Sequence, residues 1–148
     1  MKIFVCFAVV LIFLGCDKSN DQDNMLYESK SCGVDAPAKN QELLAEQAFT
    51  ISGWAFDEFS ENTPENIRVQ LISSNGQLNV AIFGKRGIQR PDIAQIFKKP
   101  GVIMSGFIMQ VSSNLLLPGK YKIVVEQNSK YYNLTCNPNT EFIIKNGQ

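Results

Sequence analysis

The feature that most constrains the fold is a succession of short apolar runs between residue 48 and the carboxyl end, separated by turn residues. In the first run Phe49, Ile51 and Ala55 alternate with Thr50 and Ser52, which is the period of two expected of a strand with one buried face. Glycine, proline, asparagine and serine lie between the runs, as they do between the strands of all-β domains. The pattern therefore predicts an all-β protein, and 148 residues suit a single domain.

The expected architecture is an antiparallel β-sandwich of about seven strands with an immunoglobulin-like arrangement and one short helix. The clearest turn is Ser74-Asn75-Gly76, because asparagine and glycine accept the positive φ angles of a tight hairpin. We expect strands over residues 49–55, 67–71, 78–83, 102–111, 119–127, 131–136 and 140–145.

The helix is expected between Pro91 and Pro100. Proline suits the first position of a helix, and Ile93, Ile96 and Phe97 follow at helical spacing. Such a helix would cap the sandwich with these apolar side chains. A single helical turn is also expected over residues 41–47.

The amino terminus has the plan of an export signal. Lys2 precedes an uncharged apolar run over residues 3–14, which is too short to cross a bilayer. The run ends in Leu14-Gly15-Cys16, which resembles the end of a bacterial lipobox, in which the cysteine is lipidated and becomes the new amino terminus. The alternative is a plain secreted protein in which Cys16 has no such role.

These features predict residues 1–15 as a signal peptide, residues 16–31 as a lipidated cysteine with a flexible tether, and residues 32–148 as the sandwich domain. The protein is then expected in the bacterial cell envelope, anchored to a membrane by acyl chains and facing the periplasm or the cell surface.

Two cysteines remain for the domain, because Cys6 leaves with the signal peptide and Cys16 carries lipid. An export signal implies an oxidising compartment, so Cys32 and Cys136 are expected to form a disulfide. Two free thiols or a metal pair are the alternatives. The sequence contains no histidine, which excludes histidine-based triads and histidine-ligated zinc. We expect no metal, cofactor or catalytic residue.

Four motifs follow one another over about 70 residues, namely Gly53-Trp54-Ala55, Arg90-Pro91-Asp92-Ile93, Ser105-Gly106-Phe107 and Pro118-Gly119. In these motifs the chain resembles a small β-sandwich accessory domain seen beside bacterial glycosyltransferases and in envelope proteins. That family has a GWA strand, an RPDV turn, an SGF strand and a PG turn, and here isoleucine replaces its valine. The resemblance implies a sandwich with an accessory or binding role and without catalysis.

The same motifs supply the candidate ligand-binding residues Trp54, Phe56, Asp57, Arg90 and Asp92. An indole can stack on a sugar ring while polar side chains bind its hydroxyls. The structural alternative is that the tryptophan packs in the core and that the arginine pins the helix by gripping one of the two aspartates. The glycine before the tryptophan indicates a bulge or a close approach of another backbone.

Charge divides the chain into two parts. Residues 17–65 carry 11 acids and 3 bases, whereas residues 67–148 carry 10 bases and 3 acids. Some of these bases could form a basic face for anionic lipid or an acidic protein, although a solvated face is the simpler interpretation. The candidates are Lys85, Arg86, Lys98, Lys99, Lys120 and Lys122. An exported, neutral chain is not expected to bind nucleic acid.

The leading hypothesis is a non-enzymatic envelope lipoprotein whose sandwich binds a glycan or another envelope protein. One alternative is an inhibitor or assembly factor that binds a protein partner through the basic face. The other is a hydrolase that uses two carboxylates, which is the minimum for cleaving a glycosidic bond. The acidic residues Asp57, Glu58, Glu61 and Glu65 lack the regular spacing of a calcium loop, so we interpret them as a solvated turn.

Overall fold

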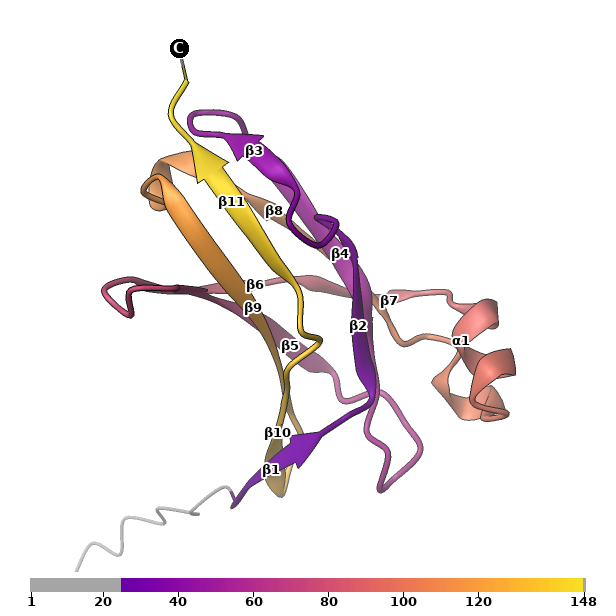
Figure 1. Cartoon of the computed structure of the whole chain (residues 1–148). Helices are drawn as coiled ribbons and strands as arrows, with labels where there is room; N and C mark the ends of the chain where they lie inside the picture. Colours follow the sequence, from indigo (N-terminus) through magenta and orange to yellow (C-terminus); the bar gives the residue numbers. More distant parts are fainter. Residues whose placement is uncertain (1–24, 148) are drawn as a thin grey trace, which may run out of the picture.

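A computed structural model describes residues 25–147. The expected signal peptide, Cys16 and the first part of the expected tether lie outside the described residues. Two sheets pack face to face, which confirms the all-β sandwich (Figure 1). One sheet contains β1 (Met25–Ser29), β10 (Tyr132–Cys136), β9 (Gly119–Asn128), β11 (Glu141–Lys145), β3 (Glu42–Leu44), β5 (Asn66–Ser73) and β6 (Asn79–Phe83). The other contains β2 (Cys32–Ala36), β4 (Phe49–Ala55), β8 (Gly106–Val111) and β7 (Lys85–Ile88).

The larger sheet is organised around β9, its longest strand. β5 pairs with residues 121–128 of β9, while β11 and β10 share the opposite edge, one at each end of the strand. β5 and β6 form the expected hairpin, with Gly76 at a φ of 70° in its turn. Most pairings are antiparallel, but β1 pairs with β10 and β3 with β11 in parallel, so the sheet is mixed rather than wholly antiparallel.

The described residues form eleven strands rather than about seven. The four additional strands are β1, β2, β3 and β7, all of five residues or fewer and all at sheet edges. Their runs are too short or too polar to show a period of two, and they form because a longer neighbour supplies the hydrogen bonds. The helical turn expected over residues 41–47 is wrong, because this segment contains β3.

The tether expected over residues 16–31 includes residues that belong to the folded domain, among them the whole of β1. Met25–Ser29 pair with β10, and Ser29 and Ser31 are buried. Residues 25–31 therefore belong to the folded domain, which begins before Cys32.

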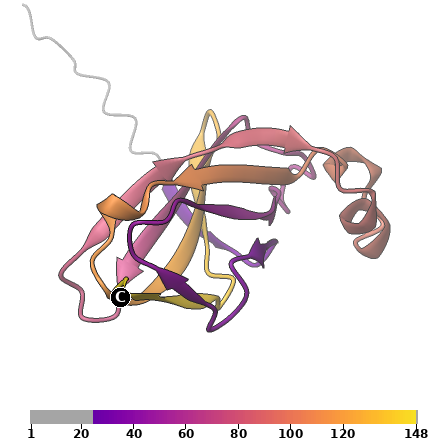
Figure 2. The same cartoon turned by 90° about the horizontal axis from the view of Figure 1, so that it is seen from above.

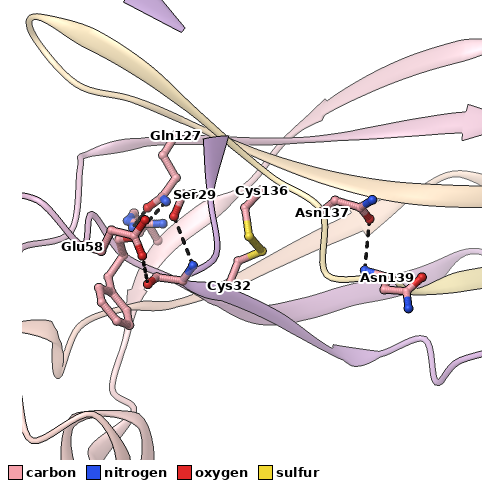
Figure 3. Close-up of a disulfide and its surroundings, with 10 residues drawn as sticks. Ser29, Cys32, Glu58, Gln127, Cys136, Asn137 and Asn139 are labelled. Carbon is pink, nitrogen blue, oxygen red and sulfur yellow. Dashed lines mark hydrogen bonds between the residues drawn. A yellow bond between two sulfur atoms is a disulfide. The ribbon is translucent and has the colours of Figure 1, made fainter. Parts of the chain in front are cut away.

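The core lies between the two sheets and follows the alternation seen in the sequence. Tyr121, Ile123 and Val125 of β9 are buried together against Ile51 and Phe107 of the facing sheet. At one end of this core the expected disulfide joins Cys32 of β2 to Cys136 of β10 across the two sheets (Figure 3). The bond therefore links the two sheets at the end of the sandwich where β2 begins and β10 ends.

The helix α1 (Pro91–Ile96) begins at the expected proline, but it does not cap the sandwich. Figures 1 and 2 show it beyond the end of β7, beside the smaller sheet. Ile93 is buried there against Phe56 and Val102, whereas Ile96 is 70% exposed. The strand expected over 102–111 starts only at Gly106, because residues before it form the 3₁₀ turn η1 (Pro100–Val102); a second 3₁₀ turn is η2 (Ser113–Leu115).

Within residues 25–147, none of the helices has the length and apolar character needed to span a bilayer.

Candidate binding site

Trp54 lies on the outer face of the smaller sheet, where two glycines make room for it. A Cβ on Gly33 would lie 2.6 Å from the indole Nε1, so the ring covers that glycine on the neighbouring strand. Gly53 approaches the same backbone from the other face, since a Cβ there would lie 2.1 Å from the Gly33 carbonyl oxygen. The expected close backbone approach beside Trp54 is thus confirmed.

The indole packs within an aromatic cluster and is half-buried. Its ring stacks on Phe56 at 5.9 Å between centroids and contacts Phe97 at 5.3 Å. Phe56 is fully buried beneath it. Trp54 and Phe56 therefore lie together as expected, but Phe56 offers no surface to a ligand.

Arg90 forms a bidentate ion pair with Asp92. Its Nε and Nη2 donate to the two carboxylate oxygens at 3.0 and 2.7 Å, and Nη1 donates to Asp35 at 2.6 Å. The hydrogen bonds from Arg90 lower the pKa of Asp92 to about 2. The structural alternative is confirmed for this pair: the arginine fastens the start of α1 to β2 and is occupied by two carboxylates.

Asp57 is not a partner of Arg90. The residue is 1% exposed, and its carboxylate accepts hydrogen bonds from the hydroxyls of Ser60 and Tyr132 and from the backbone N–H of Phe59, the last at 2.9 Å. Burial opposes its ionisation, but these donors outweigh burial and hold its pKa below the ordinary value. Asp57 therefore fixes the loop after β4 against β10 and, being buried, offers no surface to a ligand.

Three aromatic side chains meet above this aspartate, at the end of the sandwich where β1 lies. The rings of Tyr27 and Phe59 are 6.0 Å apart, and Tyr27 meets Tyr132 edge-on at 5.7 Å. They line a hollow of about 240 Å³. Tyr27 is 39% and Phe59 64% exposed, so two of the rings are open to solvent.

A second, polar hollow of about 440 Å³ has Tyr132 as a lining residue in common with the aromatic one. Its walls carry amides and hydroxyls, together with the charged side chains of Glu65 and Lys130 and the exposed ring of Tyr131. The polar side chains are Ser60, Asn62, Asn66, Asn128 and Ser129. We call the two hollows together the aromatic-end site.

The residues expected to form a basic face are scattered. Arg86 points into the sandwich, where Nη2 donates to the carbonyl oxygen of Ala55 and to Gln127 Oε1. Lys120 and Lys122 belong to β9 in the larger sheet, where Lys120 pairs with Glu141 at 2.6 Å. Lys85 lies on β7 of the smaller sheet, and Lys98 and Lys99 follow α1. Lys99 pairs with Glu61.

The sequence patterns did not identify the aromatic-end site. Tyr27 lies in a segment interpreted as a tether, and Phe59 lies in a loop interpreted as solvated. The adjacent tyrosines 131 and 132 after the Asn128-Ser129 turn were the one local signal. Among residues 25–147, no group of three or more acidic, thiol or imidazole side chains is placed to hold a metal.

No family model matches the chain, and no curated protein is significantly similar to it.

Proposed function

We propose that the protein is a non-enzymatic lipoprotein of the bacterial envelope whose β-sandwich binds a glycan at the aromatic-end site. The observation that carries the proposal is that the exposed rings of Tyr27 and Phe59 lie at the same end of the sandwich as a hollow lined mainly by amides and hydroxyls. The disulfide between Cys32 and Cys136 suits an oxidising compartment and supports export.

The chemistry of the site matches that of a sugar. The C–H groups of a sugar ring pack on aromatic faces, which combine large contact area with few rotatable bonds. Asparagine amides both donate and accept hydrogen bonds, and so do sugar hydroxyls. A concave site that combines apolar walls with a few polar groups is the usual form of a small-ligand site.

This site fits a glycan better than the residues first expected. Phe56 and Asp57 are buried, and Arg90 is already held by two carboxylates. A protein partner on a basic face has less support, because Arg86 is directed inward and Lys120 pairs with Glu141. Hydrolysis by Asp57 has little support, because that carboxylate is buried and hydrogen-bonded within the fold.

The test is glycan binding by the full chain, extracted from membranes in detergent, on an array of bacterial polysaccharides and glycolipid sugars. We expect binding that falls roughly tenfold in Phe59→Ala, since one aromatic contact contributes about 0.5–1.5 kcal/mol beyond its area. Ile96→Ala is the matched control, because Ile96 is equally exposed but lies on α1. Equal binding by wild type and Phe59→Ala, or no binding of any glycan, would contradict the proposal.

A further inference from the structure

We propose that the glycan bound at the aromatic-end site is the sugar head group of a glycolipid in the same membrane that holds the anchor. This inference rests on the proposed function. It follows from where the site lies relative to Cys16 and from the side chains around its rim.

The site begins within two residues of the first described position. Met25 and Tyr27 point to the same side of β1, and the Tyr27 hydroxyl donates to the Met25 sulfur at 3.4 Å. Tyr27 is itself one wall of the site. Figure 1 shows β1 and β10 at one end of the sandwich and the carboxyl end of β11 at the other. The site thus lies at the end of the domain where β1 begins, which is the end nearest in sequence to the proposed anchor.

The chain between the anchor and the site is short. Nine peptide steps separate Cys16 from Met25, and whatever their conformation they span at most about 30 Å, at 3.3–3.6 Å per residue. A tether that ran to residue 31 would allow about 50 Å on the same scale. Because β1 is part of the sheet, the site is confined to the layer just above the bilayer. Sugars attached to lipids occupy that layer.

The rim of the site is apolar on the side where the chain enters. Met25, whose sulfur accepts a hydrogen bond from the Tyr27 hydroxyl, is 60% exposed, and Tyr131, a lining residue of the polar hollow, is 64% exposed. Tyrosine favours the boundary between lipid head groups and water. A glycolipid would engage both parts, with its sugars in the polar hollow and its lipid-proximal end against the apolar rim. A soluble polysaccharide would use only the hollow.

The test uses the lipidated full chain reconstituted in phosphatidylethanolamine–phosphatidylglycerol vesicles with and without lipopolysaccharide. Binding is followed as slowed backbone hydrogen exchange in residues 57–62 and 129–132, titrated against lipopolysaccharide density. We expect protection only with lipopolysaccharide, weakened in Phe59→Ala and retained in Ile96→Ala. Protection of equal size in vesicles without lipopolysaccharide would overturn the inference in favour of direct contact with the bilayer.

A second variant tests the role of the tether. Inserting 30 glycine and serine residues before Met25 lengthens the link from nine to about 39 residues, and effective concentration falls roughly as the −3/2 power of linker length. The half-saturating lipopolysaccharide density should therefore rise about ninefold. An unchanged or lower density would overturn the inference.

The polysaccharide released from the same lipopolysaccharide separates the two proposals. If it binds and Phe59→Ala weakens it, while the membrane-bound form gives no protection, glycan binding stands and the glycolipid inference fails. If neither form nor any arrayed glycan binds, the proposed function itself fails.

Discussion

Arg86 donates from one guanidinium nitrogen to Gln127 Oε1 at 2.7 Å, inside the sandwich and between its two sheets. The same nitrogen reaches the Ala55 carbonyl oxygen, also at 2.7 Å. Gln127 in turn donates from Nε2 to the Phe56 carbonyl oxygen at 3.2 Å. The Arg86 Nε and Nη1 are buried without a partner among the described residues. Burial lowers the pKa of Arg86 to about 10, which indicates that keeping this charge inside the fold destabilises the folded state.

We expect Arg86→Met to stabilise the domain. Replacing a buried charge with an apolar side chain of similar length removes its desolvation cost, and replacements of buried charged groups of this kind are neutral or stabilise by about 1–4 kcal/mol. The free energy of unfolding from urea titration at pH 7 measures the change. Lys85→Met, at the exposed neighbouring position, should change it little. A loss of stability in Arg86→Met would show that its hydrogen bonds outweigh its burial.

The advantage of Arg86→Met should shrink at high pH. Arg86 is charged in both states at pH 7, so its full cost is present there. Above about pH 10 the folded state loses this proton before the unfolded state does, because the pKa of Arg86 is higher in the unfolded chain, so the unfolded state binds more protons and the wild type gains stability as the pH rises. The difference between the two proteins should be smaller at pH 11 than at pH 7.

Gln127→Leu should destabilise the domain more than loss of an ordinary surface hydrogen bond. The variant removes the acceptor that Arg86 uses and leaves its charge with the Ala55 carbonyl alone, and hydrogen bonds to charged groups contribute about 1.5–3 kcal/mol. Gln110→Leu is the control, since Gln110 donates to Thr50 on the exposed face at 3.0 Å. In the background of Arg86→Met the cost of Gln127→Leu should fall, and equal costs in both backgrounds would exclude the coupling.

Gly53→Ala should destabilise the smaller sheet. A Cβ would lie 2.1 Å from the Gly33 carbonyl oxygen and 2.9 Å from the Phe107 ring, so two strands must separate. Overpacking of this kind costs about 1–3 kcal/mol. Thermal melts of the variants measure the change in stability. Gly147→Ala, in which the added Cβ would meet nothing closer than 3.8 Å, should melt at the same temperature as wild type.

The sequence was a good guide to the strands that carry their own pattern. β4, β5 and β9 alternate over seven or more residues, and this alternation alone predicts which face is buried. The short edge strands lack such a signal, because a neighbouring strand induces them. The parallel pairing of Met25–Ser29 with β10 joins segments more than 100 residues apart, which no local pattern encodes.

The aromatic-end site was missed for the same reason, because its residues come from distant parts of the chain. Trp54 and Arg90 were found because they lie in recognisable motifs, and their packing roles follow from neighbouring glycines and carboxylates. Tyr27, Phe59 and Tyr132 come from an edge strand, a loop and a strand after a turn. Only the assembled sandwich places these rings together.

Loss of the disulfide should weaken the end of the domain that bears the site. Cys32 and Cys136 are 104 positions apart, and a cross-link over such a loop contributes about 2–5 kcal/mol. Replacing both cysteines with alanine should lower the melting temperature, and reduction should then have no further effect. If wild type melts at the same temperature with and without reductant, the bond does not contribute to stability.

Asp92→Asn should destabilise the protein in a pH-dependent way. The Arg90 hydrogen bonds depress the folded pKa of Asp92 to about 2 from an ordinary value of 3.8, so the carboxylate contributes stability that is fully present above pH 3.8 and lost as the pH falls through 2. The melting temperature of the variant should therefore lie below that of wild type at pH 7, and the two should converge near pH 2.

Glu46→Gln is the control for that comparison, because Glu46 is exposed and has no ion pair among the described residues. It should track wild type at both pH values. A gap between wild type and Asp92→Asn that persists at pH 2 would mean that the side chain acts through packing at the start of α1 as well as through its charge. Arg90→Lys, which cannot hold both carboxylate oxygens with a planar fork, should then reproduce only the pH-dependent part of the loss.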